Sequence, residues 1–167
     1  GVSRICSKSG LVILIYHRVL PQPDPMLPDV PDAVMFSMHM SLISRFFRVL
    51  PLDSALTQLH SGRLESPAVA VTFDDGYADN LEVALPILRA FNIPATVFVA
   101  PGFLDGGIMF NDAITEIFRR VPTGLFDAQS LNLGAWRIDD WASRRLAAAN
   151  VIRKVKYLPL DQRQLMI

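Results

Sequence analysis

The stretch that decides the fold is "AVAVTFDDGYADN", residues 68–80. Its apolar start runs directly into two adjacent carboxylates, Asp74 and Asp75, and then into Gly76. A short, β-branched apolar run of this kind is typical of a strand buried in a parallel sheet. Because Gly76 allows the chain to turn at once, both carboxylates can lean over the carboxyl end of the strand. Active sites of parallel α/β folds lie at that end.

The doubled carboxylate permits two interpretations. Two carboxylates this close repel each other unless a cation or a shared proton lies between them. One of them could therefore bind a metal ion while the other serves as a general base towards water. The sequence Asp-Asp-Gly is also ordinary turn chemistry, since Asp and Gly dominate tight turns. The residues alone leave both interpretations open.

The segments around this stretch alternate between strand and helix patterns. Such an order predicts right-handed crossovers and a parallel sheet with flanking helices. The predicted strands are 11–19, 68–73 and 95–101, with short strands around Gly134. The predicted helices are one capped by Ser41, then 51–62, one introduced by the capping-box spacing of Asp79 and Glu82, 111–120 and 139–157. The helix after Asp79 has an apolar stripe formed by Leu81, Ala84, Leu85, Leu88 and Phe91.

Composition limits the classes of function. The chain has 167 residues, enough for one domain, and its 16 basic and 16 acidic residues cancel. This balance argues against nucleic acid or an anionic membrane as the main partner. The longest apolar run near the start, Leu11 to Tyr16, is too short for a transmembrane helix or a signal peptide. The single cysteine, Cys6, excludes a disulfide within the chain.

The two ends suggest a cut chain. We interpret residues 1–10 as a tail or an expression remnant, and residues 11–167 as part of one domain. Asp161 resembles a helix N-cap, and the amphipathic pattern after it has no stop signal before Ile167.

The motif residues resemble those of the polysaccharide deacetylase family, the chitooligosaccharide-deacetylase homology domain. The resemblance is carried by "VTFDDGYADN" and "ALPILRAFNIPATVFVAPGFLDGG", and extends back to "LVILIYHRV" and forward to "MFNDAITEIFRR". It implies the N-terminal portion of a distorted (β/α) barrel. It also implies a metal-dependent hydrolase that removes acetyl groups from N-acetylated polysaccharides or oligosaccharides.

Residue roles follow from the same resemblance, position by position. Asp74 corresponds to the catalytic base, and Asp75 corresponds to a ligand of a divalent metal ion, usually zinc, with cobalt or nickel as alternatives. His17, at the end of the first strand, corresponds to an active-site wall residue, although a histidine hydrogen-bonded beneath a loop fits equally well. Tyr77 follows the turn and could line the same mouth or simply pack. His39 is expected to be structural.

The chain departs from the family pattern in its histidines. The family supplies two more metal ligands from a downstream His-x-x-x-His motif, and no histidine follows His60 here. We therefore expect both ligands beyond residue 167, and a 167-residue chain that is inactive alone and self-associates. The alternative is a carbohydrate-binding or scaffolding domain that keeps the fold without catalysis, and a phosphate-accepting receiver domain is a weaker one. The sugar and the compartment, cytoplasm or cell envelope, stay open.

Overall fold

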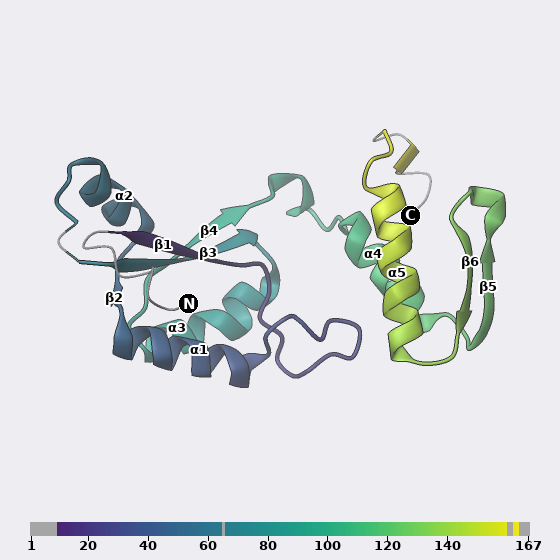
Figure 1. Cartoon of the computed structure of the whole chain (residues 1–167), viewed down its shortest axis with the longest axis horizontal. Coiled ribbons are helices and arrows are strands. Elements are labelled where there is room, and N and C mark those ends of the chain that lie inside the picture. Colours follow the sequence, from purple (N-terminus) through teal and green to yellow (C-terminus); the bar gives the residue numbers. More distant parts are fainter. Residues whose placement is uncertain (1–9, 65, 160–161, 164–167) are drawn as a thin grey trace. The chain divides into compact units, whose positions relative to one another are not determined.

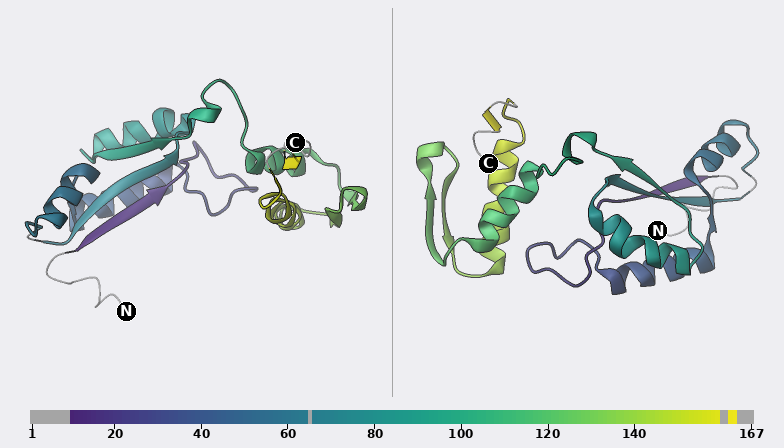
Figure 2. Two further views of the ribbon diagram at one scale, coloured as in Figure 1. Left: turned by 90° about the horizontal axis from the view of Figure 1, so that it is seen from above. Right: turned by 180° about the vertical axis from the view of Figure 1, so that it is seen from behind.

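The computed structural model describes residues 10–64, 66–159 and 162–163, which form parts of two compact units, residues 1–101 and 102–167. Figures 1 and 2 show the elements of both units. Cys6, the tail up to residue 9 and the predicted cap at Asp161 lie outside the described residues.

The first unit alternates strands and helices, as the sequence pattern predicts. Its elements, in chain order, are β1 (Leu11–Tyr16), α1 (Ala33–Phe46), β2 (Arg48–Val49), α2 (Leu52–His60), β3 (Ala68–Asp75), a π-helical turn η2 (Asn80–Ala84), α3 (Leu85–Ala90) and β4 (Ala95–Val99). A short 3₁₀ turn, η3 (Pro101–Phe103), follows β4.

Strand β3 is the centre of a parallel four-stranded sheet. One of its edges pairs with β1 from Leu11↔Ala68 to Tyr16↔Phe73. Its other edge is shared, because β2 pairs at Ala68 and Val69 while β4 pairs from Val71 to Asp75. All of these pairings are parallel, which confirms the α/β prediction of parallel strands with flanking helices.

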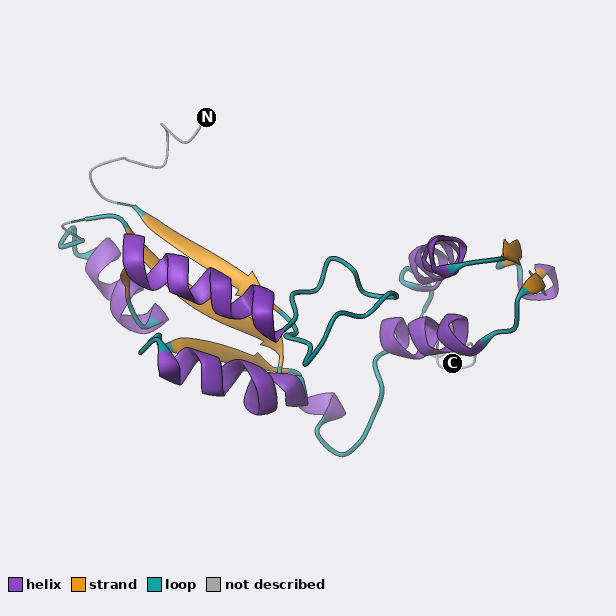
Figure 3. Cartoon of the chain, turned by 90° about the horizontal axis from the view of Figure 1, so that it is seen from below, coloured by secondary structure: helices purple, strands orange, loops and turns teal. Residues whose placement is uncertain are grey.

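One face of this sheet forms the core of the first unit. Helices α1 and α3 cover that face (Figure 3), whereas α2 lies on the opposite side (Figure 1). Side chains alternate along a strand, so every second residue of β3 points towards α1 and α3. These residues are Val69, Val71 and Phe73. The Phe73 ring contacts those of Tyr16 and Phe36, at centroid distances of 5.6 and 5.9 Å.

Helix α1 begins eight residues earlier than the predicted cap at Ser41. Its N-cap is Asp32, whose carboxylate accepts a hydrogen bond from the Met35 amide at 2.8 Å. The Pro-rich loop ends at this aspartate, and a single bridge between Leu20 and Asp32 closes the loop. Ser41 is therefore an interior helix residue, and its cap-like position in the sequence was misleading because a better acceptor lies upstream.

The helix after β3 also differs from its prediction. It opens as the π-helical turn η2, and Asp79 makes no side-chain capping bond at its start. The wider turn changes which residues face the core. Leu81 is consequently 68% exposed, whereas Asn80, Ala84 and Leu88 are buried. The capping box and the place of Leu81 in the apolar stripe were therefore wrong.

Strand β4 exists, but it is not buried. Val97, Phe98 and Val99 are each about half exposed. The reason is that β4 pairs only with β3 among the described strands, so one of its edges lacks a neighbour there. Part of β1 is open in the same way, since Ile15 is 61% exposed. Apolar strand faces of this kind invite association, and self-association of the chain stays a prediction.

The second unit packs a helix pair on a hairpin. Its elements are α4 (Phe110–Arg120), β5 (Gly124–Ala128), a 3₁₀ turn η4 (Gln129–Leu131), β6 (Gly134–Ile138) and α5 (Trp141–Val155). The two strands are antiparallel, and β6 confirms the strand predicted around Gly134. Helix α5 begins with a capping box between Asp140 and Ser143, whose backbone amide holds the pKa of the Asp140 carboxyl below its usual value.

No helix in the described part of the chain is both long enough and apolar enough to cross a bilayer.

The position of Phe73 in the core leads to a prediction for the stability of the chain. Phe73→Ala removes a fully buried ring and should lower the free energy of unfolding by about 3–5 kcal/mol. Leu81→Ala is the matched control, because this exposed residue would have been in the core if the predicted stripe were right. It should change the free energy of unfolding by less than about 0.5 kcal/mol in urea denaturation. A larger loss for Leu81→Ala than for Phe73→Ala would contradict this packing.

Candidate active site

The chain leaves β3 through two consecutive left-handed residues, the last residue of the strand and the glycine after it. Asp75 has a φ of 71° and Gly76 a φ of 73°. The turn thus starts one residue earlier than the glycine suggests, and a non-glycine residue adopts a conformation that costs free energy. The Asp75 carbonyl accepts a hydrogen bond from the Ala100 amide at 3.2 Å, which ties this turn to the end of β4.

Gly76 is required by space as well as by backbone conformation. A Cβ atom at this position would lie 3.1 Å from a methyl group of Val99. A Cβ atom there would require the Val99 side chain to shift by a few tenths of an ångström, and the positive φ of Gly76 strains any L residue in addition. The pair Asp75–Gly76 thus fixes how the chain leaves the sheet beside Asp74.

The structure brings His17 and Asp74 together. Tyr16 pairs with Phe73, so the next residue of each strand lies at the same edge of the sheet. The distance from His17 Nε2 to Asp74 Oδ2 is 3.9 Å, beyond hydrogen-bond range but close enough for an ion pair when the imidazole is protonated. Their side chains are 57% and 40% exposed, so both reach solvent at the carboxyl end of the strands.

A buried carboxylate that the sequence analysis missed lies next to this pair. Asp79 accepts hydrogen bonds from Arg18 Nε at 2.8 Å, from the Val19 amide at 3.2 Å and from Asn80 Nδ2 at 3.2 Å. Asn80 Nδ2 also donates to the His17 carbonyl at 2.9 Å. The spacing of Asp79 and Glu82 suggested a helix cap instead. The available signal was Arg18, a cation directly after His17 that needs an anionic partner.

Tyr77 lies beside this network. The Arg18 guanidinium sits 4.6 Å from the centre of the Tyr77 ring, a cation–π geometry. The packing interpretation of Tyr77 therefore has a definite contact. Its role as a wall of the site stays a prediction, as does that of His17.

Tyr16 and His39 form a separate contact on the core side of the sheet. The Tyr16 hydroxyl lies 3.3 Å from His39 Nδ1. Burial raises the pKa of the Tyr16 phenol, because desolvation disfavours the phenolate. This contact supports the expectation that His39 is structural.

The described residues do not fit a complete metal centre. Catalytic zinc generally has three protein ligands. No group of three or more His, Cys, Asp or Glu side chains within the described part of the chain could hold a metal ion. Asp75 could supply one oxygen ligand, but the described residues bring too few further ligands to it.

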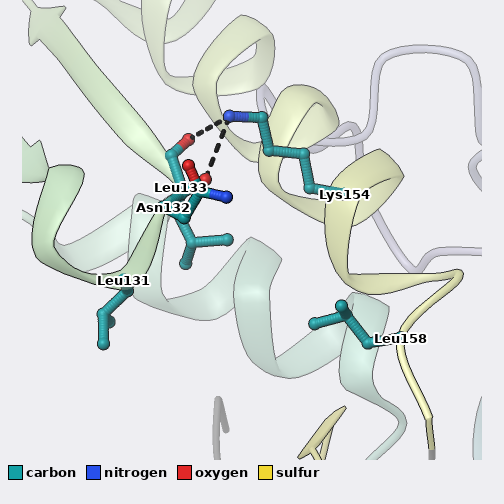
Figure 4. Close-up of a pocket in the computed structure, with 5 residues that line it drawn as sticks. All are labelled: Leu131, Asn132, Leu133, Lys154 and Leu158. Atoms are coloured by element: carbon teal, nitrogen blue, oxygen red, sulfur yellow. Dashed lines mark hydrogen bonds between the residues drawn. The ribbon is translucent and has the colours of Figure 1, made fainter.

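A pocket in the second unit offers no competing chemistry. Its volume is about 450 Å³, and Figure 4 shows the residues that line it, Leu131, Asn132, Leu133, Lys154 and Leu158. The Lys154 ammonium already donates to the carbonyls of Asn132 and Leu133 at 3.2 and 3.1 Å. We therefore take the carboxyl end of β3 as the candidate active site.

The chain is a parallel α/β protein with two adjacent carboxylates at the end of the central strand of its sheet. The sequence model of one family, Polysaccharide deacetylase, matches residues 61–132, which include the whole of this turn. A putative polysaccharide deacetylase of Bacillus subtilis (strain 168), YxkH, is 29% identical over 91 residues. That match covers 53% of this chain and 31% of the relative, so the chain spans about a third of its length.

Solved structures show the same fold. The Streptococcus pyogenes deacetylase PplD, in complex with acetate, matches at 21% identity and a TM-score of 0.53, over 65% of this chain and 52% of that one. IcaB from Ammonifex degensii matches at 24% identity and a TM-score of 0.53, over 89% of this chain and 67% of that one. The sequence matches confirm the resemblance to the polysaccharide deacetylase family, and the solved structures show that the fold is shared.

The incomplete ligand set makes a prediction for metal binding. The 167-residue chain should bind Zn²⁺ or Co²⁺ weakly, because Asp75 alone cannot form a catalytic site. Isothermal titration calorimetry of this chain and of Asp75→Ala should give the same weak heats. Stoichiometric, sub-micromolar zinc binding that disappears in Asp75→Ala would contradict this expectation.

Proposed function

We propose that this chain belongs to a metal-dependent hydrolase that removes N-acetyl groups from a polysaccharide or oligosaccharide. The observation that carries the proposal is the placement of Asp74. It stands half-exposed at the carboxyl end of the central strand, beside His17, and within the segment that matches the family. Ligands and catalytic groups of parallel α/β folds gather at this end of the sheet.

Asp74 has the surroundings that a general base needs. Its carboxylate is open to solvent, so an attacking water can reach it. In the proposed reaction Asp74 takes a proton as the water oxygen bonds to the acetyl carbon. The carbon–nitrogen bond then breaks, acetic acid leaves and ionises to acetate, and the sugar nitrogen becomes an amine by taking the proton that Asp74 received. Such general acid–base transfer is typically worth about 10²–10⁴-fold in rate.

Asp75 has a different proposed role. Its left-handed backbone turns it out of the alternation of β3, so that two adjacent carboxylates need not serve the same purpose. We assign it as one ligand of a divalent metal ion, zinc or else cobalt or nickel, by its position in the family motif. The remaining ligands are the two histidines expected beyond residue 167. His17 and Tyr77 are assigned to the wall of the substrate site.

The two aspartates are separable by mutation in the full-length protein. Asp74→Asn should reduce acetate release from an N-acetylated oligosaccharide by about 10²–10⁴-fold, because the amide cannot accept the proton. Its metal content should not change. Asp75→Asn should instead lower the metal content, measured by atomic emission after gel filtration. Asp139→Asn, in an exposed pair with Arg137, is the matched control and should leave both quantities unchanged.

Two results would contradict the assignment. Loss of metal from Asp74→Asn with retention in Asp75→Asn would exchange the two roles. A metal-loaded wild-type protein that binds N-acetylated sugars without releasing acetate would favour the carbohydrate-binding alternative.

A further inference from the structure

We propose that Asp79 and Arg18 form a positioning pair that sets the separation of His17 and Asp74. The inference rests on the proposed function for its catalytic consequence, whereas its geometric part stands on the structure alone. Neither residue needs to contact the substrate. They act through the chain segments that follow His17 and Asp74.

The ladder between β1 and β3 stops short of the functional residues, although β3 continues to Asp75 in its pairing with β4. The pairing of β1 with β3 ends at Tyr16↔Phe73. His17 and Asp74 are the next residues, so no ladder hydrogen bond between β1 and β3 holds them at a fixed separation. Some other interaction must fix the loop after β1 against the turn after β3.

Asp79 supplies that interaction across 61 residues of sequence. Its carboxylate accepts hydrogen bonds from Arg18 Nε and from the Val19 amide, and these two residues directly follow His17. Asn80, the next residue, donates from Nδ2 to the His17 carbonyl at 2.9 Å. Three consecutive residues after β1 are thus held by two consecutive residues at the start of η2, beyond the end of the β1–β3 ladder.

The burial of Asp79 makes this contact costly to break. The residue is only 8% exposed, and a buried carboxylate is strongly unfavourable without charge-bearing or hydrogen-bonding partners. Arg18 provides the opposite charge, and its side chain is 31% exposed. The guanidinium also stacks over the Tyr77 ring, which lies between Asp74 and Asp79 in the chain. Moving the His17 loop would therefore break an ion pair, two further hydrogen bonds and a ring contact together.

The primary test compares Asp79→Asn with wild type in the full-length protein. The amide keeps the size of the side chain and an acceptor for Val19, but it loses the charge that pairs with Arg18. Misplacement of reacting groups by about an ångström can cost up to roughly 10²-fold in rate. We expect kcat for acetate release to fall by about 10- to 100-fold, with KM and metal content near wild type.

Arg18 variants separate positioning from a general loss of stability. Arg18→Met, at a more exposed position, should reproduce the loss in kcat, and Arg18→Lys should restore part of it. The double variant Asp79→Asn/Arg18→Met should be no slower than either single variant, because all three variants remove the same ion pair. Asp139→Asn is the matched control for charge loss and should keep wild-type kcat. Additive losses, or losses that appear in KM alone, would overturn the proposal.

A structural readout keeps this test independent of the proposed function. Crystal structures of wild type and of Arg18→Met should show a wider separation of His17 Nε2 and Asp74 Oδ2 in the variant. The Val19 amide should also exchange with deuterium faster. If wild type releases no acetate but the separation widens, the proposed function fails and the positioning pair stands. An unchanged separation in a folded variant would overturn the positioning pair whatever the activity.

Discussion

The parallel pairing of β1 with β3 is the constraint on which the candidate site depends. Its register, Tyr16 opposite Phe73, places His17 and Asp74 side by side just beyond the last pair of the ladder. A shift by one residue would turn Asp74 towards the core face, because side chains alternate along a strand. The same register puts Phe73 among the buried aromatic rings of the core. Packing on one face therefore determines which carboxylate is exposed on the other.

The turn after β3 and the contacts of Asp79 extend this constraint beyond the sheet. Asp75 and Gly76 take left-handed conformations, and Val99 leaves little room for a side chain at Gly76. Asp79 then reaches back to the loop that follows β1. The π-helical turn begins directly after Asp79 with Asn80, whose side chain donates a hydrogen bond to the His17 carbonyl. Irregular backbone is concentrated where the functional residues lie, as is common at such sites.

Much of this arrangement was predictable, and its failures have physical causes. The apolar run before Asp74, the glycine after Asp75 and the strand–helix order were sufficient for the parallel sheet and the carboxylates at its edge. Predictions from local sequence patterns were wrong where a residue outside the pattern determines the structure. The helix predicted to be capped by Ser41 is capped by Asp32 instead. Asp79, predicted to cap the following helix, pairs with Arg18, which is 61 residues away in the sequence. The strand at 95–101 looked buried because its residues are apolar, yet β4 has one open edge among the described strands.

The most direct test of this account is the proximity of the His17 ring and the Asp74 side chain in solution. Nuclear Overhauser spectra of isotope-labelled protein report such contacts without reference to activity. The account predicts cross-peaks between the His17 ring protons and the Asp74 β-protons, together with cross-strand contacts between Tyr16 and Phe73. Cross-peaks that pair His17 with Phe73 instead, a register shifted by one residue, would contradict it.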